Sequence, residues 1–176
     1  ATMAFRRHLS GLGLGIAEAM DTAQRGMGLD WPTSLELIRR TRTELPQANV
    51  VNGCGTDQLD PADARDVDDV IRAYMEQVEA IQGVGARIIL MASRALVRVA
   101  RGPQDYLRVY AKVLAACDRP VVLHWLGDAF DPALRGYWGT EDFGQALETV
   151  LEMIGQNITK VDGIKISLLD KDKEII

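Results

Sequence analysis

The feature that most constrains this 176-residue chain is an alternation of short β-branched runs with longer amphipathic segments. Runs typical of strands lie at 49–54, 87–91, 120–125 and 163–168, and a glycine-rich stretch at 13–18 resembles a strand more weakly. Apolar strands separated by helical segments are typical of parallel sheets joined by crossover helices. The pattern therefore predicts an α/β fold with five parallel strands.

The segments between these runs place apolar residues three or four positions apart, as one buried face of a helix requires. We expect helices over 2–12, 35–45, 67–81, 106–117 and 143–154. Pro46 ends the second of these, and Pro103 is typical of a first helical turn. Thr140, which precedes two acidic residues, is expected to cap the last helix.

Two architectures have this order of elements: a doubly wound open sheet and a (β/α)8 TIM barrel. The glycines at 11, 13 and 15 lack the GxGxxG spacing of a dinucleotide-binding open sheet. A complete barrel has eight strands and typically about 250 residues. We therefore expect residues 1–176 to form a single domain that is an incomplete TIM barrel, from the middle of a larger protein.

Composition narrows the classes of partner. Hydrophobic residues make up 47% of the chain and charged residues 26%, as in ordinary globular proteins. A formal net charge of −5 argues against nucleic-acid binding, and no apolar run has the length of a membrane span. The N-terminus has no signal-peptide pattern, and Cys54 and Cys117 form no CxxC motif. We expect a reduced, cytoplasmic protein with no nucleic-acid or membrane partner.

Polar side chains follow each predicted strand, and in parallel α/β folds the carboxyl ends of strands carry the chemistry. Arg25 and Arg94 are suited to hold an anionic group through paired hydrogen bonds. The loop at 126–139 carries aromatic residues, which predict either a lid over a pocket or a packing surface for another subunit. The predicted substrate-binding residues are Glu18, Asp21, Arg25, Asp57, Ser93, Arg94 and Trp125.

Lys165 is the sharpest single signal, because it interrupts an apolar strand between Ile164 and Ile166. Strand side chains alternate between faces, so Lys165 is expected to point into the barrel when its neighbours pack on helices. Burial lowers the pKa of a lysine and frees its amine as a nucleophile for a Schiff base. A lysine paired with a carboxylate, or one that reaches solvent, is the alternative.

His124 also lies in a strand, where it is either a buried core residue or an acid–base group. Two distant histidines do not suggest a zinc site, so we expect no metal and no cofactor. The alternative is Mg²⁺ or Mn²⁺ held by Glu18, Asp21 and Asp57.

The segment VDGIK at 161–165 resembles the sixth strand of the dihydrodipicolinate synthase and N-acetylneuraminate lyase superfamily, whose Schiff-base lysine stands in a similar sequence. The segments at 53–56, 85–91 and 120–126 resemble its third, fourth and fifth strands. More closely, nearly the whole chain resembles an uncharacterised bacterial family that is dihydrodipicolinate-synthase-like. The runs that carry this likeness are GLGIAEAMDTAQRGMGLDW, GTDQLD, ILMASRAL, GPQDYL, VLHWLGDAFDPAL and KVDGIKISLLD.

The resemblance implies a homo-oligomeric TIM barrel, present here from about helix 1 to strand 6, without strands 1, 7 and 8. It implies that Lys165 forms an imine with a 2-oxo acid such as pyruvate. At the position where the superfamily has a proton-relaying tyrosine, this chain has Ala-Ser-Arg-Ala at residues 92–95. The threonine-rich turn that binds the substrate carboxylate in the superfamily is also reduced in this chain. We expect His124 to replace the tyrosine and Arg94 to replace the lost carboxylate contacts.

The sequence therefore predicts a Schiff-base-forming lyase or aldolase that acts on a small 2-oxo acid or a sugar-like carbonyl compound. Lys165 forms the imine, and His124 transfers protons. One alternative is a divalent-metal-dependent barrel enzyme in which Lys165 is an acid–base group. The other is a non-catalytic barrel that binds a small acid or sugar.

Overall fold

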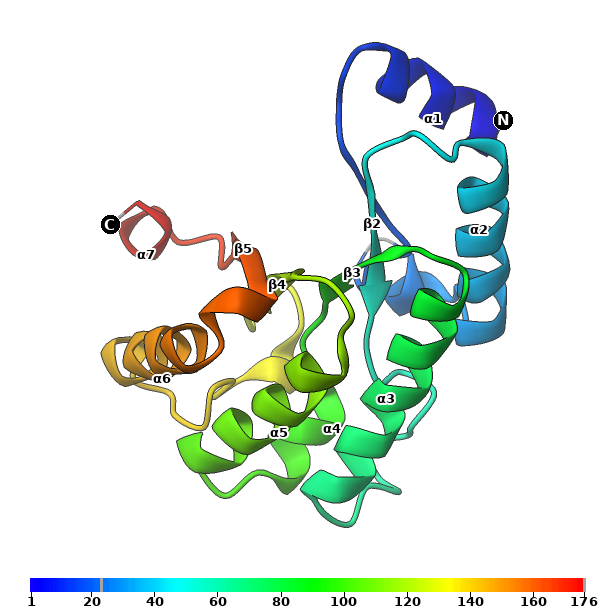
Figure 1. The fold of residues 1–176 in the computed structure, drawn as a ribbon. Helices are drawn as coiled ribbons and strands as arrows, with labels where there is room; N and C mark the ends of the chain where they lie inside the picture. Colours follow the sequence, from blue (N-terminus) through cyan, green and yellow to red (C-terminus); the bar gives the residue numbers. More distant parts are fainter. Residues whose placement is uncertain (23, 176) are drawn as a thin grey trace.

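The computed structural model describes residues 1–22 and 24–175, which form an α/β fold around one five-stranded sheet (Figure 1). Every neighbouring pair of strands is parallel, and the strand order β1-β2-β3-β4-β5 follows the chain. The strands are β1 (Ile16–Glu18), β2 (Val50–Cys54), β3 (Arg87–Leu90), β4 (Val121–Leu126) and β5 (Val161–Ser167). Sequential parallel order is the order of a TIM barrel, and the described strands form part of one. The predicted fold class is confirmed.

The helices agree with the five expected from apolar spacing, and two short ones are added. The α-helices are α1 (Thr2–Gly11), α2 (Trp31–Glu44), α3 (Val67–Gly83), α4 (Arg94–Val99), α5 (Pro103–Ala116), α6 (Phe143–Gln156) and α7 (Lys171–Glu174). The 3-10 turns are η1 (Arg25–Met27), η2 (Pro132–Leu134) and η3 (Ile158–Lys160). The sequence did not indicate α4 or α7, because helices of 6 and 4 residues are too short to show a periodic pattern.

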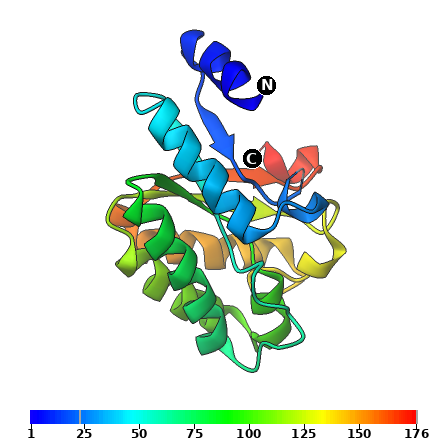
Figure 2. The same cartoon turned by 90° about the vertical axis from the view of Figure 1, so that its right-hand side faces the viewer.

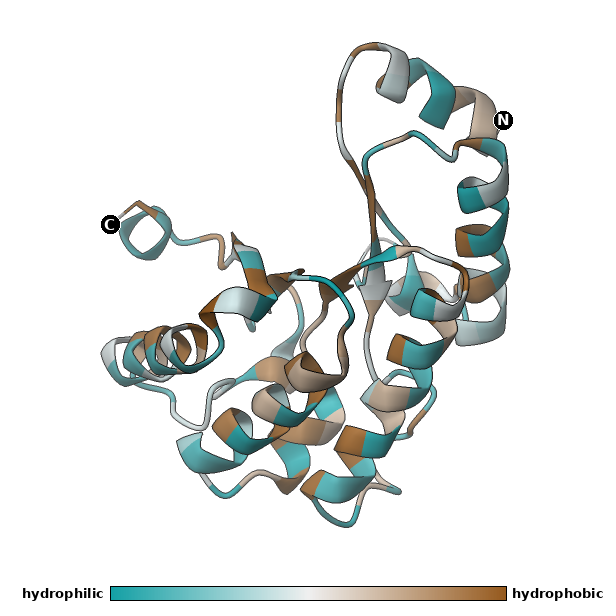
Figure 3. Cartoon of the chain, in the orientation of Figure 1, coloured by the Kyte–Doolittle hydropathy of each residue, from teal (hydrophilic) through white to brown (hydrophobic). Residues whose placement is uncertain are grey.

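The helices α2, α3, α5 and α6 follow one another around the outer side of the curved sheet (Figures 1 and 2). Their apolar faces and the outward side chains of the strands form one core, which includes Tyr74, Ile81, Leu114 and Leu123. Figure 3 shows these strands largely in the hydrophobic colour, while the helices alternate between hydrophobic and hydrophilic stretches. Burial of this layer supplies the main driving force for folding.

Acidic N-caps set the helix starts. The Asp66 and Asp30 side chains accept backbone N–H groups at the starts of α3 and α2. The prediction that Thr140 caps the helix at 143 is wrong, because Asp142 does so by accepting the N–H of Gln145. Asp142 stands directly before the first helical residue, whereas Thr140 Oγ1 accepts the N–H of Asp142 itself.

The aromatic residues in the loop after β4 pack inside this chain. Tyr137 and Trp138 are buried, and their rings contact Tyr106 and Tyr110 on α5. Both predictions for this loop, a lid and a subunit surface, are therefore wrong for these two residues. Phe130 is the aromatic side chain of the loop that is exposed.

Both cysteines are buried free thiols: Cys54 ends β2, and Cys117 follows α5. Burial raises the pKa of Cys54 well above its ordinary value and that of Cys117 to about 11. Among the described residues, no helix combines the length and the apolar character that crossing a membrane requires.

Candidate functional site

Lys165 lies on the inner face of β5, as the alternation of strand side chains predicts. Its outward neighbours Ile164 and Leu168 pack against the core. Lys165 instead lines a hollow on the inner face of the sheet with Val122 and Ile89. The expectation that its side chain is buried is wrong, because the described strands form an open sheet and leave Lys165 exposed.

The register between β4 and β5 brings the amine of Lys165 to His124. The two residues are paired across the parallel strands, so their side chains stand side by side on the inner face. Lys165 Nζ lies 2.9 Å from His124 Nε2 and donates to Ser167 Oγ at 2.6 Å. His124 Nε2 also lies 3.3 Å from Ser167 Oγ. An amine, an imidazole and a hydroxyl therefore share one point at the carboxyl end of the sheet.

Asp21 stands behind the imidazole. Its Oδ2 lies 3.1 Å from His124 Nδ1, and both side chains are almost fully buried. Neither atom makes an aligned hydrogen bond to any described residue. The ring of His124 is thus held between a carboxylate on one side and an amine on the other.

The charge of Asp21 determines which nitrogen of His124 carries the proton. Burial alone raises the pKa of Asp21, but the adjacent His124 ring and the backbone N–H of Thr22 together outweigh it, so the pKa lies below its usual value. An ionised carboxylate is only an acceptor and therefore favours a proton on Nδ1. In the neutral ring this leaves Nε2 as the acceptor, facing Lys165 Nζ.

Close packing of the β1–α2 loop on β2 positions Asp21. At Gly53, an added Cβ would collide with the carbonyl oxygen of Ala19, so only glycine permits this approach. Arg25 ties the same loop down, because its Nη2 donates to the Gly53 carbonyl at 2.5 Å and its Nη1 to Asp57 at 2.6 Å.

A small cavity of about 80 Å³ opens beside this loop. Four predicted substrate-binding residues line it: Asp21, Arg25, Asp57 and Arg94. Arg25 donates to Asp57, Gln77 and the Gly53 carbonyl, which together use most of its hydrogen-bonding capacity. Among the described residues, Arg94 makes a side-chain hydrogen bond through Nε alone, to Asp131 at 2.5 Å, and its side chain is 41% exposed. Arg94 is therefore the cation of this cavity best placed to receive an anionic group.

Three predicted binding residues do not reach the cavity. Glu18 turns outward, where it is paired with Arg6 on α1 and accepts a hydrogen bond from Thr41 on α2 at 2.7 Å. Trp125 also points outward and stacks on Phe143 with ring centroids 5.7 Å apart. Ser93 is buried as the N-cap of α4. These three residues support packing, so the prediction that they contact substrate does not fit their positions.

Sequence reasoning missed Gln77, which holds the Arg25–Asp57 pair from α3. It is fully buried; its Oε1 accepts from Arg25 and from the N–H of Gly55, and its Nε2 donates to Asp57. The signal was present, because Gln77 lies on the same helical face as Tyr74 and Ile81. A polar residue within an apolar helical stripe indicates a buried hydrogen-bond network.

The carboxylates of the alternative metal site do not meet. Glu18 faces the helices, while Asp21 and Asp57 face the cavity and are paired with His124 and Arg25. Among residues 1–22 and 24–175, no group of three or more His, Cys, Asp and Glu side chains is placed to hold a metal ion.

Comparison with known proteins identifies the family to which this chain belongs. The model of the DUF993 family, described as a protein of unknown function, matches residues 1–176. The chain belongs to this family. No curated protein matches this chain.

Solved structures similar to this DUF993 chain include members of the dihydrodipicolinate synthase family. A dihydrodipicolinate synthase from Bacillus anthracis has a TM-score of 0.69 and 14% identity, covering 98% of this chain and 50% of that one. A monomeric dihydrodipicolinate synthase variant has a TM-score of 0.68 and 13% identity, covering 98% and 49%. A prophage protein of the same family from E. coli K12, in complex with pyruvate, has a TM-score of 0.60 and 15% identity, covering 94% and 56%.

These similarities show that the DUF993 chain shares the fold of about half of a dihydrodipicolinate synthase barrel. They agree with the resemblance that the sequence carries at residues 161–165. At this low sequence identity, the shared fold does not indicate which substrate this chain binds. The chain also spans about half the length of the structures it matches.

Proposed function

We propose that this chain carries the amine and the proton-transfer groups of a Schiff-base-forming lyase or aldolase acting on a 2-oxo acid or a related carbonyl compound. The observation that carries the proposal is the 2.9 Å contact between Lys165 Nζ and His124 Nε2, with Asp21 behind the ring. The dihydrodipicolinate-synthase-like fold supports it.

In the proposed reaction, neutral Lys165 attacks the carbonyl carbon of the substrate. A C–N bond forms as the carbonyl π pair moves to oxygen, giving a carbinolamine after proton transfer. His124 Nε2 removes a proton from the nitrogen and returns it to the hydroxyl, which leaves as water when the C=N bond forms. The contact distance of 2.9 Å is within the range that direct proton transfer requires.

Asp21 acts through His124 in this proposal. An ionised carboxylate at Nδ1 keeps Nε2 directed at the amine and stabilises the imidazolium that forms when Nε2 takes a proton. Asp21 is thus a positioning residue, and Lys165 and His124 are the residues that touch the reacting atoms.

Arg94 is proposed to bind the carboxylate of the substrate. Its two Nη groups make no hydrogen bond to any described residue, so a paired contact to a carboxylate is available. The cavity that Arg94 lines adjoins the Lys165–His124 pair through Asp21. The pyruvate complex of the E. coli neighbour supports an oxo acid as the first compound to test.

Borohydride trapping tests the proposal directly. The protein is incubated with pyruvate and a panel of 2-oxo acids and aldehydes, reduced, digested and analysed by peptide mass. We expect an adduct on the peptide that contains Lys165, its loss in Lys165→Ala, and its retention in Lys112→Ala, a matched exposed lysine on α5. The absence of any adduct from folded protein across the panel would overturn imine chemistry and favour a barrel that only binds its ligand.

The cytoplasmic location and the homo-oligomeric assembly that the sequence suggests remain predictions. Size-exclusion chromatography with light scattering, run on the protein used for trapping, measures the assembly.

A further inference from the structure

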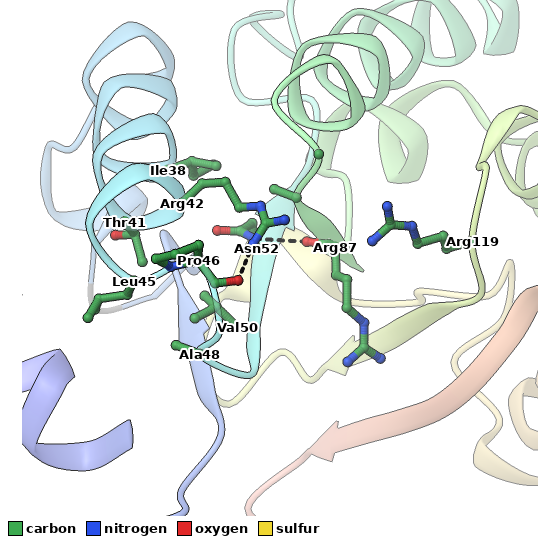
Figure 4. Close-up of a pocket in the computed structure, with 12 residues that line it drawn as sticks. Ile38, Thr41, Arg42, Leu45, Pro46, Ala48, Val50, Asn52, Arg87 and Arg119 are labelled. Atoms are coloured by element: carbon green, nitrogen blue, oxygen red, sulfur yellow. Dashed lines mark hydrogen bonds between the residues drawn. The ribbon is translucent and has the colours of Figure 1, made fainter. Parts of the chain in front are cut away.

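We propose a second ligand site, for a small organic anion with a short apolar body, at the opposite end of the sheet from Lys165. The site is a pocket of about 240 Å³ at the amino ends of β2 and β3, between the end of α2 and the loop before β4 (Figure 4). We call it the basic pocket. Its lining residues are Ile38, Thr41, Arg42, Leu45, Pro46, Ala48, Val50, Asn52, Gly85, Ala86, Arg87 and Arg119.

The charges of the basic pocket have one sign. Three arginines and no acidic residue line it, although the chain as a whole has a net charge of −5. In Figure 4 the guanidinium groups of Arg42 and Arg119 point toward each other, whereas that of Arg87 turns away. Two facing cations repel each other, so an anion between them would be stabilised by both.

Neither facing arginine is paired with an acidic side chain in the part of the chain that the structure describes. Arg42 donates to the carbonyl oxygen of Pro46, which carries no formal charge. Arg119 makes no salt bridge and no side-chain hydrogen bond with residues 1–22 or 24–175. Arg87, by contrast, is paired with Asp162 at 2.6 Å. The positive charge available to a ligand therefore comes from Arg42 and Arg119.

The remaining lining fits a ligand with an apolar body and a hydroxyl. Ile38, Leu45 and Val50 form the apolar part of the pocket. Asn52 is only 3% exposed, and its Nδ2 donates to the carbonyl of Arg87, which fixes the orientation of the amide. Its Oδ1 accepts no side-chain or backbone hydrogen bond from the described residues, so it can accept one from a ligand hydroxyl.

The basic pocket is independent of the proposed imine chemistry. Strands in a parallel sheet carry their catalytic groups at the carboxyl ends, whereas this pocket lies at the amino ends. None of its lining residues belongs to the Asp21–His124–Lys165 group or to the cavity around Arg94. Arg87 also lines the hollow beside Lys165, but it is paired with Asp162 and is not one of the two facing arginines. A ligand bound here leaves Lys165 free.

Calorimetric titration with four probes tests the site. Valerate and butyl phosphate present a carboxylate and a phosphate on similar apolar chains, valeramide removes the charge, and acetate removes most of the apolar chain. We expect saturable binding of valerate or butyl phosphate, with the tighter of the two identifying the anionic group. Valeramide and acetate are expected to bind at least about tenfold more weakly, because each loses one of the two interactions.

Variants locate the binding. Arg42→Gln and Arg119→Gln are each expected to weaken it about tenfold. Arg39→Gln, an exposed arginine on α2 outside the pocket, and Lys165→Ala are expected to leave it unchanged. Equal binding of valerate and valeramide, or no saturable binding of either anion, overturns the proposal. So does loss of binding in Lys165→Ala, which would place the anion at the carboxyl ends of the strands.

Discussion

Glu18 and Asp21 stand at the same end of β1 and are both buried, yet they face opposite sides of the sheet. Glu18 points outward and is held by Arg6 and Thr41. Asp21 points toward the inner side and is held by His124. Burial raises the pKa of Glu18 and outweighs the opposing effects of Thr41 and Arg6, whereas the partners of Asp21 outweigh burial and lower its pKa.

The different partners of these two residues give them different roles: Glu18 is a structural carboxylate that joins helices to the sheet, and Asp21 is one that can take part in the reaction. Glu18 connects β1 with α1 and α2, and its partner is a cation at any ordinary pH. Asp21 faces an imidazole, a side chain that can both donate and accept hydrogen bonds, and that imidazole contacts an amine. The partner of a buried carboxylate therefore indicates its role better than its burial does.

The largest expected effect comes from breaking the Arg6–Glu18 ion pair on the outer side of the sheet. Arg6→Met leaves Glu18 buried without its cation and is expected to lower the free energy of unfolding by about 3–5 kcal/mol. Urea denaturation measures it. Adding Glu18→Met to this variant is expected to recover most of the loss, because no buried charge then lacks a partner. Arg7→Met, which breaks an exposed pair with Glu44, is the control and is expected to cost at most about 1 kcal/mol.

A change in the Asp21–His124 pair on the inner side of the sheet is expected to affect the reaction. Asp21→Asn keeps the shape of the side chain but removes the charge that directs His124, so the rate of borohydride trapping at Lys165 is expected to fall about a hundredfold. The pH profile of trapping is expected to shift as well, which a loss of packing alone would not cause. An unchanged rate and profile in folded protein would remove Asp21 from the proposed mechanism.

A smaller effect is expected from the hydroxyl that supports Glu18. Thr41→Val keeps the volume and removes the hydrogen bonds to Glu18 and from Arg6, so we expect a loss of about 1–2 kcal/mol in stability. Trapping at Lys165 should be unaffected. Thr43→Val, on the exposed side of the same helix, is the matched control, and an equal loss there would contradict a special role for Thr41.

The smallest effect is expected in the pH dependence of stability, because the two carboxylates act in opposite directions. The stabilisation from Asp21 is complete above its ordinary pKa of 3.8 and is lost as the pH falls through the lower pKa of the folded state. Glu18 has a raised pKa in the folded state, so its penalty is complete above that pKa and disappears as the pH falls through it toward 4.5.

Denaturation over a pH series separates these contributions. Glu18→Gln should remove a gain of stability on acidification, and Asp21→Asn should remove a loss at lower pH. Identical pH curves for the two variants would contradict the contrast between the two sides of β1.

Local sequence patterns predicted the five strands and the five longer helices of this fold. The positions of α3, α5 and α6 follow from apolar residues three and four apart, and the inward direction of Lys165 follows from strand alternation. These inferences depend on spacing along the chain, which a single sequence displays.

The sequence could not show which side of the sheet receives each polar residue in the loops. β1 has only three residues, so its alternation does not distinguish an inward from an outward Glu18. Arg25 and Arg94 are both polar loop residues in the sequence, but Gln77 and Asp57 occupy one of them and leave the other accessible. Such pairings depend on contacts between distant segments.

The two buried thiols give the chain its own reporters of local opening. Cys54 ends β2, the second strand of the sheet, beneath α3, and Cys117 lies where α5 returns to the sheet. Because a thiol reagent needs both access and a thiolate, each cysteine reacts only when its region opens. The rates of alkylation at Cys54 and Cys117 therefore compare how often the helices separate from the sheet at its two ends, and no cysteine has to be introduced by mutation.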